Sequence, residues 1–348
     1  MTDDVVIRIE GAAGRITLNR PKALNALNRP MTDAITAALV RWRDDASVKH
    51  VVIDGAGGRA FCAGGDIRAV YDMIPTDPEF PRAYWRAEYR LNAMIARYEK
   101  PYVALMDGFC LGGGVGLSAH GSHRIVTERS FVGMPETAIG FTPDVGGAWL
   151  LARAPGHAGE YMAAVAYRMN AADAIYAGFA DTMIRAEDIP AFVAALSEGQ
   201  DAGETARRFS IPPGASGLAA RQADIDLIFG TETVQEAARR LKAMAGPWAE
   251  ETLGKISSHS PTALAAAHFS VRKVRGFGRV EESLDHEYRY AHRATGLHDF
   301  REGVRALIVD KDGKPQWRPA HLDDVRMSDV VALFAPLGKD ELGLAAGS

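Results

Sequence analysis

Two acidic residues lie eight positions apart in a stretch that otherwise consists mostly of apolar residues and glycine. Glu136 occurs in MPETAIG and Asp144 occurs in TPDVGG. A carboxylate in apolar surroundings tends to have a perturbed pKa, and such groups cluster at functional sites. Two close carboxylates in a dry pocket also resist simultaneous ionisation, so they titrate as a pair. The type and setting of these residues therefore predict acid–base chemistry.

A glycine-rich stretch ahead of the two acids predicts a site for an anion. The apolar run from Tyr102 to Met106 is short enough for a buried strand, and GFCLGGGVGLS follows it. Glycine tolerates the close approach of another group. The chain then enters a short helix, whose first backbone N–H groups suit a phosphate or a transient oxyanion. An anion site near two acids suggests chemistry at a polarised carbonyl.

Several single residues have a second interpretation. Asp144 precedes VGGAWLLAR, so it can also be the N-cap of a helix. Glu88 lies on a predicted helix, where its charge can simply be solvated. Asp66, in FCAGGDI, is expected to cap its helix and to order the turn before it. Cys62 and Cys110 have no basic neighbour that would lower the thiol pKa, so we expect both to be buried and inert.

The elements that must position these residues alternate between strands and helices. An alternating stretch over 5–9, a GAAG turn and a second extended stretch over 16–18 predict a hairpin. Helical spacing of apolar residues begins at Met31 and recurs over 83–98. This order of elements implies βαβ units and a largely parallel sheet.

A change of composition near residue 186 predicts the domain organisation. Residues 1–185 are expected to form an α/β core that carries the site. Residues 186–348 are rich in Ala, Leu, Arg and Glu and are expected to be helical. The pattern leaves open whether these helices form a separate domain, wrap the core or mediate oligomerisation.

Composition excludes several classes of protein. The 348 residues include 40 basic and 44 acidic side chains, a net charge of −4, which gives no reason to expect binding to nucleic acid or to an anionic membrane. No apolar run is long enough to span a bilayer, and MTDDVVIRIE does not resemble a signal peptide. The two cysteines could form one disulfide at most, too few to stabilise a fold of this size, so a reducing, cytoplasmic location is expected. His120 and His123 have no third ligand at metal spacing, so no metal site is expected.

FCAGGDI, GFCLGGGVGLS and MPETAIGFTPDVGG together resemble the crotonase, or enoyl-CoA hydratase/isomerase, superfamily, and within it the 3-hydroxyisobutyryl-CoA hydrolases. The resemblance extends from NRPKALNAL near the start to DKDGKPQWRPAHL near the end. It implies an α/β fold with a crotonase-like ββα-superhelix core and a helical C-terminal portion. It also implies an acyl-CoA substrate, no cofactor, and a homo-oligomer, either a trimer or a hexamer.

The resemblance assigns the groups that bind the substrate. Crotonases hold the thioester carbonyl between two backbone N–H groups, and Ala63 and Gly113 match these positions. Gly64 lies beside the first donor, and Asp66 follows it. The resemblance also implies that Glu88 contacts the substrate, at the 3-hydroxyl of the acyl group.

The resemblance also indicates the reaction. Hydratases use two glutamates, of which one matches Glu136 and the other falls at Gly116. Asp144 instead stands where hydratases usually carry glycine. This exchange favours thioester hydrolysis over water addition, with Glu136 activating water or attacking the thioester itself, and Asp144 moving a proton. The product of 3-hydroxyisobutyryl-CoA would be 3-hydroxyisobutyrate, as in valine breakdown.

Three functions remain as alternatives. Another crotonase reaction, hydration or isomerisation, is disfavoured by Gly116. A binder of acyl-CoA without catalysis is disfavoured by the presence of both acids. A nicotinamide-dependent dehydrogenase is more distant, because the glycines do not form the dinucleotide-binding pattern.

Overall fold

A computed structural model of the chain describes residues 2–346, which form two units. Unit 1 is built from the residues up to Asp66, Ala87–Gly133 and Met169–Gly217. Unit 2 is built from Ile67–Arg86, Met134–Arg168 and the residues from Leu218 onward. Each unit has its own architecture and its own share of the predicted site.

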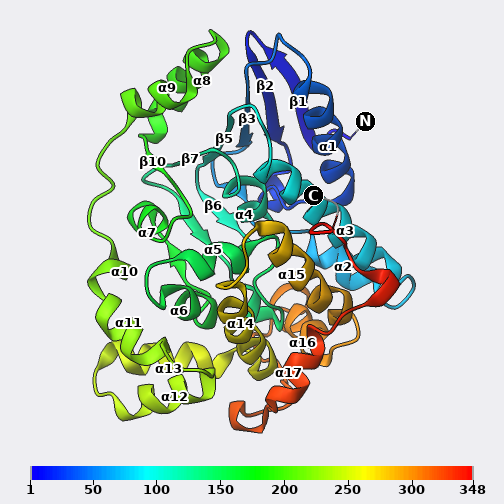
Figure 1. Ribbon diagram of the computed structural model, residues 1–348, viewed down its shortest axis with the longest axis vertical. Helices are drawn as coiled ribbons and strands as arrows, with labels where there is room; N and C mark the ends of the chain where they lie inside the picture. The colour runs from blue at the N-terminus through cyan, green and yellow to red at the C-terminus, as the bar shows by residue number, and fades with distance from the viewer. Residues whose placement is uncertain (1, 347–348) are drawn as a thin grey trace. The chain divides into compact units, whose positions relative to one another are not determined.

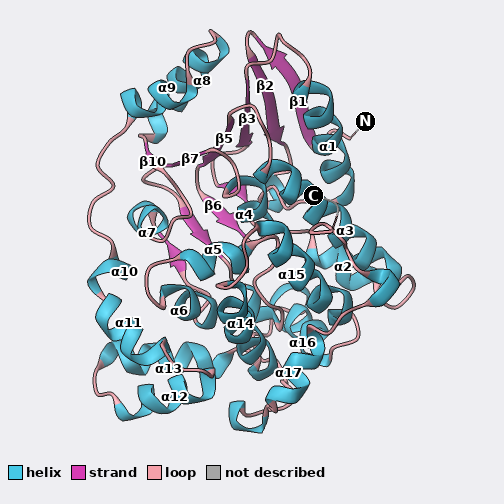
Figure 2. Ribbon diagram, in the orientation of Figure 1, coloured by secondary structure: helices cyan, strands magenta, loops and turns pink. Residues whose placement is uncertain are grey.

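The main sheet of unit 1 has six strands in the order β1-β2-β3-β5-β7-β10 (Figures 1 and 2). Its strands are β1 (Val5–Glu10), β2 (Ala13–Leu18), β3 (His50–Gly55), β5 (Tyr102–Met106), β7 (His123–Val126) and β10 (Thr182–Met183). β1 and β2 are antiparallel, which confirms the predicted hairpin, and every later pairing is parallel. The parallel order confirms the predicted α/β class, because parallel neighbours need crossover connections.

A second sheet carries the glycine-rich turns. It has the order β4-β6-β8-β9, with β4 (Ala60–Cys62), β6 (Phe109–Leu111), β8 (Phe131–Gly133) and β9 (Arg168–Met169). β4, β6 and β8 are parallel, and Cys62 of β4 lies opposite Cys110 of β6. Two neighbouring parallel strands therefore deliver the turns after Cys62 and after Leu111 to the same edge of the sheet.

Unit 1 also contains helices, and several of them pack against strands of its two sheets. The helices are α1 (Arg29–Arg43), the C-terminal part of α3 (Glu79–Ala96), α4 (Gly113–Ser118), α7 (Ala171–Tyr176), α8 (Ile189–Ser197) and α9 (Ala202–Phe209). Asn28 caps α1 by accepting from the Met31 N–H at 3.0 Å. Asn170 caps α7 in the same way, by accepting from the Asp173 N–H.

The boundary predicted at residue 185 does not coincide with either unit. Phe192 and Leu196 of α8 and Ala206 of α9 share one buried core with Val52 and Val103 of the sheet. These two helices are therefore part of unit 1, although their composition resembles that of the helices that follow. Residues 67–86 and 134–168, which were expected in the α/β core, belong instead to unit 2.

Unit 2 is helical. Its elements are α2 (Ile67–Met73), the N-terminal part of α3, α5 (Gly147–Arg153), α6 (Ala158–Ala164), α11 (Gln222–Phe229), α12 (Val234–Ala243), α13 (Pro247–Ser258), α14 (Pro261–Val274), α15 (Val280–Ala294), α16 (His298–Val304) and α17 (Met327–Leu333). The short α10 (Gly217–Ala220) begins at the last residue of unit 1. α14 is nearly buried throughout and contacts α5, α6, α12, α15 and α17.

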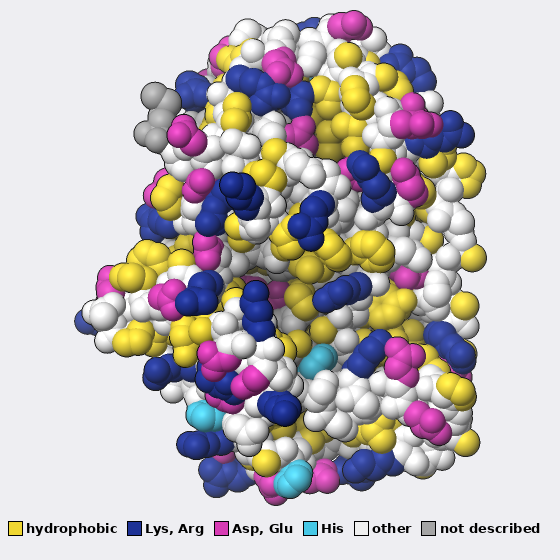
Figure 3. All heavy atoms as spheres, turned by 180° about the vertical axis from the view of Figure 1, so that it is seen from behind, with side chains coloured by type: hydrophobic (Ala, Val, Ile, Leu, Met, Phe, Trp, Pro, Cys, Tyr) yellow, Lys and Arg dark blue, Asp and Glu magenta, His cyan; other side chains and the backbone are white. Residues whose placement is uncertain are grey.

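The surface carries both signs of charge. Figure 3 shows Lys and Arg side chains interspersed with Asp and Glu over the face in view, and no extended basic stripe. Among the helices of residues 2–346, none combines the length and the hydropathy that crossing a bilayer requires.

Candidate active site

Three groups of unit 1 meet at Gly113, the first residue of α4. A Cβ atom placed on Gly113 would lie 2.6 Å from Oε1 of Glu88 and 3.2 Å from the backbone nitrogen of Gly65. Only glycine fits there without displacing a neighbour. The N–H of Gly113 occupies the first turn of α4, where no acceptor within the helix exists. Gly113 therefore lies beside the turn that carries Gly64 and Gly65.

The second predicted donor is wrong by two residues. The N–H of Ala63 donates to the carbonyl oxygen of Leu24 at 3.0 Å, so it is already used inside the protein. The N–H of Gly65 takes part in none of the backbone hydrogen bonds of the described chain, and its nitrogen is the one that faces Gly113. The two N–H groups that can share one oxygen are therefore those of Gly65 and Gly113.

Glu88 is a buried carboxylate and not a solvated charge. Its exposed fraction is 2%, although it lies on α3, a helix with many charged residues. The proximity of its Oε1 to Gly113 places an acceptor next to the two N–H donors. The role of Glu88 in substrate binding stays a prediction, and its location agrees with it.

The turn between β4 and α2 is fixed by a short ion pair. Arg20 donates to the Asp66 carboxylate at 2.9 Å and to the carbonyl of Ala26 at 2.6 Å. Gly64 has a φ of +116°, which favours glycine, and its carbonyl accepts from the Leu27 N–H at 2.8 Å. Asp66 thus orders the turn, as predicted, and its proposed contact with substrate is not needed to explain its position.

In unit 2, Glu136 opens a short 3-10 helix, Glu136–Ile139, and its exposed fraction is 7%. The next residue, Thr137, is fully buried and donates to the carbonyl oxygen of Ala163 at 2.9 Å. Phe141 ends this segment by stacking on Trp85 at 5.4 Å between ring centroids. These contacts fix the backbone that carries Glu136, so the carboxylate is held on a rigid turn.

Asp144 is not the N-cap of α5. The N-cap is Gly146, at a φ of +78°, a residue without a side chain that could cap the helix. Glu287 of α15 accepts instead from the N–H groups of Gly146, at 2.7 Å, and Ala148, at 3.1 Å. The prediction that Asp144 is the N-cap of this helix is therefore wrong, and its side chain is 7% exposed.

The turn that carries Asp144 is strained and clamped. Val145 has a φ of +51°, a conformation in which a β-branched residue is a genuine outlier. Such strain costs about 1–3 kcal/mol and persists only where the surroundings over-determine the backbone. Glu287 supplies this constraint through its two backbone acceptor contacts, and Ser283 donates to it at 2.8 Å.

Glu287 is a titratable group that sequence reasoning missed. Burial, with an added effect of the nearby Asp144 charge, raises the pKa of Glu287 to about 8. The hydrogen bonds from Gly146, Ser283 and Ala148 lower this pKa but do not outweigh burial. Nothing in DHEYRYAHR distinguishes Glu287 from an ordinary helix glutamate, so no signal in the sequence could have found it.

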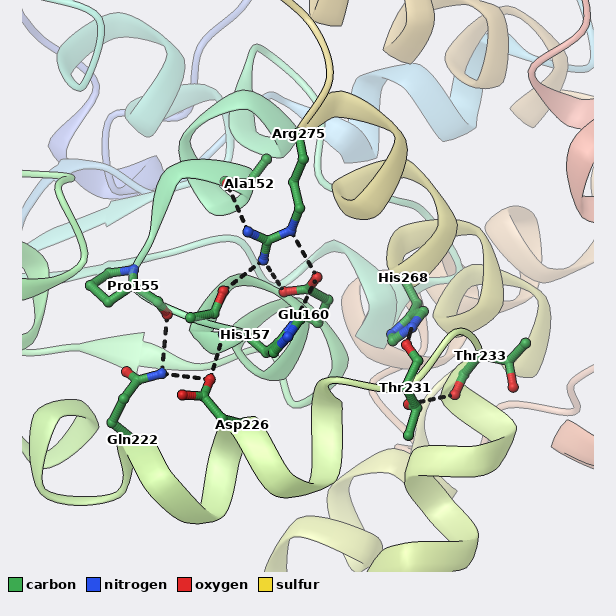
Figure 4. Close-up of polar contacts among 11 residues, drawn as sticks. Ala152, Pro155, His157, Glu160, Gln222, Asp226, Thr231, Thr233, His268 and Arg275 are labelled. Atoms are coloured by element: carbon green, nitrogen blue, oxygen red, sulfur yellow. Dashed lines mark hydrogen bonds and ion pairs between the residues drawn. The ribbon is translucent and has the colours of Figure 1, made fainter.

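The far end of α5 is held by Arg275 (Figure 4). Its guanidinium donates to the carbonyl oxygens of Ala152, at 3.2 Å, and Gly156, at 2.8 Å. The same group pairs with the fully buried Glu160 at 2.7 Å. Asp226 accepts from the His157 N–H at 2.7 Å and so ties this loop to α11. Both ends of α5 are thus fixed by residues from far along the chain.

Both cysteines are buried. Burial raises the pKa of the Cys62 thiol to about 12, and it raises the pKa of Cys110 well above its ordinary value. Neither thiol can supply a thiolate nucleophile at neutral pH. Among residues 2–346, no group of three or more His, Cys, Asp or Glu side chains is arranged to hold a metal ion.

Comparison with known proteins gives one family. The family model described as Enoyl-CoA hydratase/isomerase matches residues 13–334. The mitochondrial 3-hydroxyisobutyryl-CoA hydrolase of Xenopus laevis is 38% identical over 344 residues, which cover 96% of this chain and 89% of that protein. The human protein of the same name is 36% identical over 356 residues and covers 98% of this chain and 90% of its own length.

Two solved structures share the fold. One, titled a carnitinyl-CoA dehydratase from Mycobacterium thermoresistibile, is 41% identical, with a TM-score of 0.94 and 98% of each chain covered. The other, titled an enoyl-CoA hydratase from Rhodobacter sphaeroides 2.4.1, is 46% identical, with a TM-score of 0.91 and coverage of 98% of this chain and 99% of that one. These matches confirm the predicted crotonase-like fold class.

Proposed function

Because the chain belongs to the enoyl-CoA hydratase/isomerase family, we propose that it is an acyl-CoA thioester hydrolase that acts on a 3-hydroxyacyl-CoA. The preferred substrate in this proposal is 3-hydroxyisobutyryl-CoA, which would yield 3-hydroxyisobutyrate and CoA, a step of valine breakdown. The names of the curated relatives support this choice. The titles of the two solved structures instead name a dehydratase and a hydratase, so water addition is the function to test against it.

One observation carries the choice of hydrolysis. Glu287 accepts from the N–H groups of Gly146 and Ala148 at the start of α5, and the loop before that helix carries a second acid, Asp144, eight residues after Glu136. The position at which hydratases have their second glutamate is Gly116, which offers no acid or base. A chain with this pair of acids suits attack at a carbonyl carbon better than proton transfer to an enoyl carbon.

In the proposed mechanism, the thioester oxygen accepts from the N–H groups of Gly65 and Gly113. Negative charge grows on this oxygen as the carbonyl carbon becomes tetrahedral, and losing one such donor costs about 10²- to 10³-fold in rate. Glu136 either removes a proton from the attacking water or attacks the carbon itself to give an anhydride that water then opens.

Asp144 then passes to the departing sulfur a proton that comes from the consumed water. In either route the C–S bond breaks, a C–O bond forms, and one water is consumed for each acid and thiol released.

The test is release of free CoA. The protein is incubated with 3-hydroxyisobutyryl-CoA and a thiol reagent, and with crotonyl-CoA while the enoyl absorbance is followed. We expect CoA release, no hydration of crotonyl-CoA, and a fall of at least about 100-fold in kcat for Glu136→Gln with acyl-CoA binding retained. Loss of enoyl absorbance without CoA release would identify a hydratase, and binding without either would identify a non-catalytic protein.

We also propose a reducing compartment and a homo-oligomer. The two buried, free cysteines support the first; the vertebrate relatives are named as mitochondrial. A trimer or hexamer rests on the family resemblance alone. Fractionation of the source cells and a light-scattering mass test these two points.

A further inference from the structure

Asn92 of α3 is a buried amide that the protein itself does not use. Its side chain is 0% exposed, and neither Oδ1 nor Nδ2 has a hydrogen-bond partner within residues 2–346. Burial of an amide without a partner is costly, and the great majority of buried side-chain polar atoms have one. The amide of Asn92 therefore retains both a donor and an acceptor for a group outside the chain.

The other fully buried asparagine of unit 1 shows the contrast. Asn25 donates through Nδ2 to the carbonyl oxygens of Ala56, at 2.9 Å, and Ala60, at 2.8 Å. Its Oδ1 accepts from the Arg20 N–H at 2.9 Å. An asparagine that serves the fold is thus saturated in this protein, and Asn92 is not.

The position of Asn92 relates it to the candidate site. Asn92 follows Glu88 by four residues in α3, and side chains at this spacing are neighbours on one helix face. Oε1 of Glu88 lies next to Gly113, whose N–H is one of the two proposed donors. Asn92 therefore lies one helical turn from the carboxylate that faces the thioester site.

We propose that Asn92 and Glu88 form a recognition pair for the hydroxyl group of the acyl chain, which makes Asn92 a specificity-determining residue. The inference rests on the proposed thioester hydrolysis. A hydroxyl has one donor and two acceptor lone pairs, whereas an ionised carboxylate can only accept. Glu88 accepts a hydrogen bond from the substrate hydroxyl, and Nδ2 of Asn92 donates a hydrogen bond to the hydroxyl oxygen.

This pair would select 3-hydroxyacyl groups over simple acyl groups. A site built to hydrogen-bond a substrate hydroxyl rejects an analogue without it by about 10⁴- to 10⁵-fold, because buried polar groups are then left unpaired. Removing the donor of the pair leaves the hydroxyl oxygen of the bound substrate buried without a partner. This should lower kcat/KM for the hydroxylated substrate by about 10- to 100-fold.

The experiment compares kcat/KM for 3-hydroxyisobutyryl-CoA and isobutyryl-CoA in four proteins: wild type, Asn92→Leu, Asn92→Ala and the control Asn25→Ala. We expect the preference for the hydroxylated substrate to fall about 10- to 100-fold in both Asn92 variants, with isobutyryl-CoA cleaved at least as fast as by the wild type. Asn92→Leu should also melt no lower than wild type, because it removes an unsatisfied buried amide. Asn25→Ala should melt lower and keep the wild-type preference.

Two outcomes overturn the inference in distinguishable ways. If the wild type cleaves 3-hydroxyisobutyryl-CoA and both Asn92 variants keep its preference, Asn92 does not read the hydroxyl, and the proposed hydrolysis stands. If the wild type cleaves neither thioester, the hydrolysis and the inference both fail. An equal loss on both substrates together with a lower melting temperature would assign Asn92 to the fold alone. If Asn92→Leu does not fold, the substrate preference of Asn92→Ala, whose side chain adds no volume, tests the inference.

Discussion

Replacing Glu287 with glutamine should flatten the pH dependence of stability between about pH 5.5 and 7.5. Glutamine has the size of glutamate, can still accept from one N–H of the Asp144 turn, and carries no proton that titrates in this range. The wild-type carboxyl is buried and has a pKa of about 8, against 4.5 for an ordinary glutamate. The variant therefore removes one titration and changes little else.

The sign and size follow from proton linkage. Between the two pKa values the folded protein keeps the Glu287 proton while the unfolded chain has lost it, so stability falls as pH rises. The stabilisation that the bound proton of Glu287 contributes is fully present below the pKa of this residue in the unfolded chain. It is lost as the pH rises to the pKa in the folded protein, about 8. One proton corresponds to about 1.4 kcal/mol per pH unit, or about 3 kcal/mol over two units.

Urea unfolding followed by tryptophan fluorescence provides the assay. Unit 2 contains four of the five tryptophans, namely Trp85, Trp149, Trp248 and Trp317. We expect the free energy of unfolding of Glu287→Gln to vary less steeply with pH than that of wild type. The difference between the two slopes should be about 1.4 kcal/mol per pH unit, the value for one titrating proton. Glu187→Gln, at an exposed glutamate, is the control and should keep the wild-type slope. Parallel curves for Glu287→Gln and wild type would refute the assignment of a raised pKa to Glu287.

Four further predictions concern the site and the residues next to it. Asp144→Asn should lower kcat for thioester cleavage by about 100-fold or more and leave the melting temperature nearly unchanged, because Gly146 and not Asp144 is the N-cap of α5; an unchanged kcat would remove Asp144 from the mechanism. Gly113→Ala should fold, since alanine favours a helix, but should lose most activity because its methyl group would displace Glu88; wild-type kcat/KM would contradict the convergence of groups at this residue. Gly114→Ala, whose methyl group would collide with the Cys62 carbonyl oxygen, should instead lower the melting temperature. Serine at both cysteines should keep kcat within about tenfold, and stoichiometric inactivation by alkylation of one native thiol, with binding intact, would argue against this.

Local patterns predicted the elements well and the exact donor poorly. The hairpin and the parallel strands have a period or an apolar run that depends only on nearby residues. The choice between Ala63 and Gly65 depends on which N–H group is already bonded, and that is decided by the pairing of the turn with Leu24 and Leu27, far back in the chain. A run of small residues cannot show which of its N–H groups points outward.

Long-range packing explains the other differences. Composition could not show which helices after residue 185 pack on the sheet, because α8 and α9 have the composition of the later helices and only their contact with the sheet core assigns them to unit 1. Glu287 was missed because its partner, Gly146, is 141 residues away. The motif that contains Glu136 and Asp144, by contrast, could be recognised from its own residues.

The separation of Gly146 and Glu287 along the sequence determines when the enzyme can become active during its synthesis. The ribosome completes Gly146 141 residues before Glu287, an interval on the order of ten seconds at about 5–20 residues per second. Through that interval the nascent chain already contains both acids, yet the turn at Val145 lacks the carboxyl that accepts from its backbone. The reactive geometry is therefore acquired near the end of translation, and a polypeptide released early would carry the whole motif without the means to hold it in place.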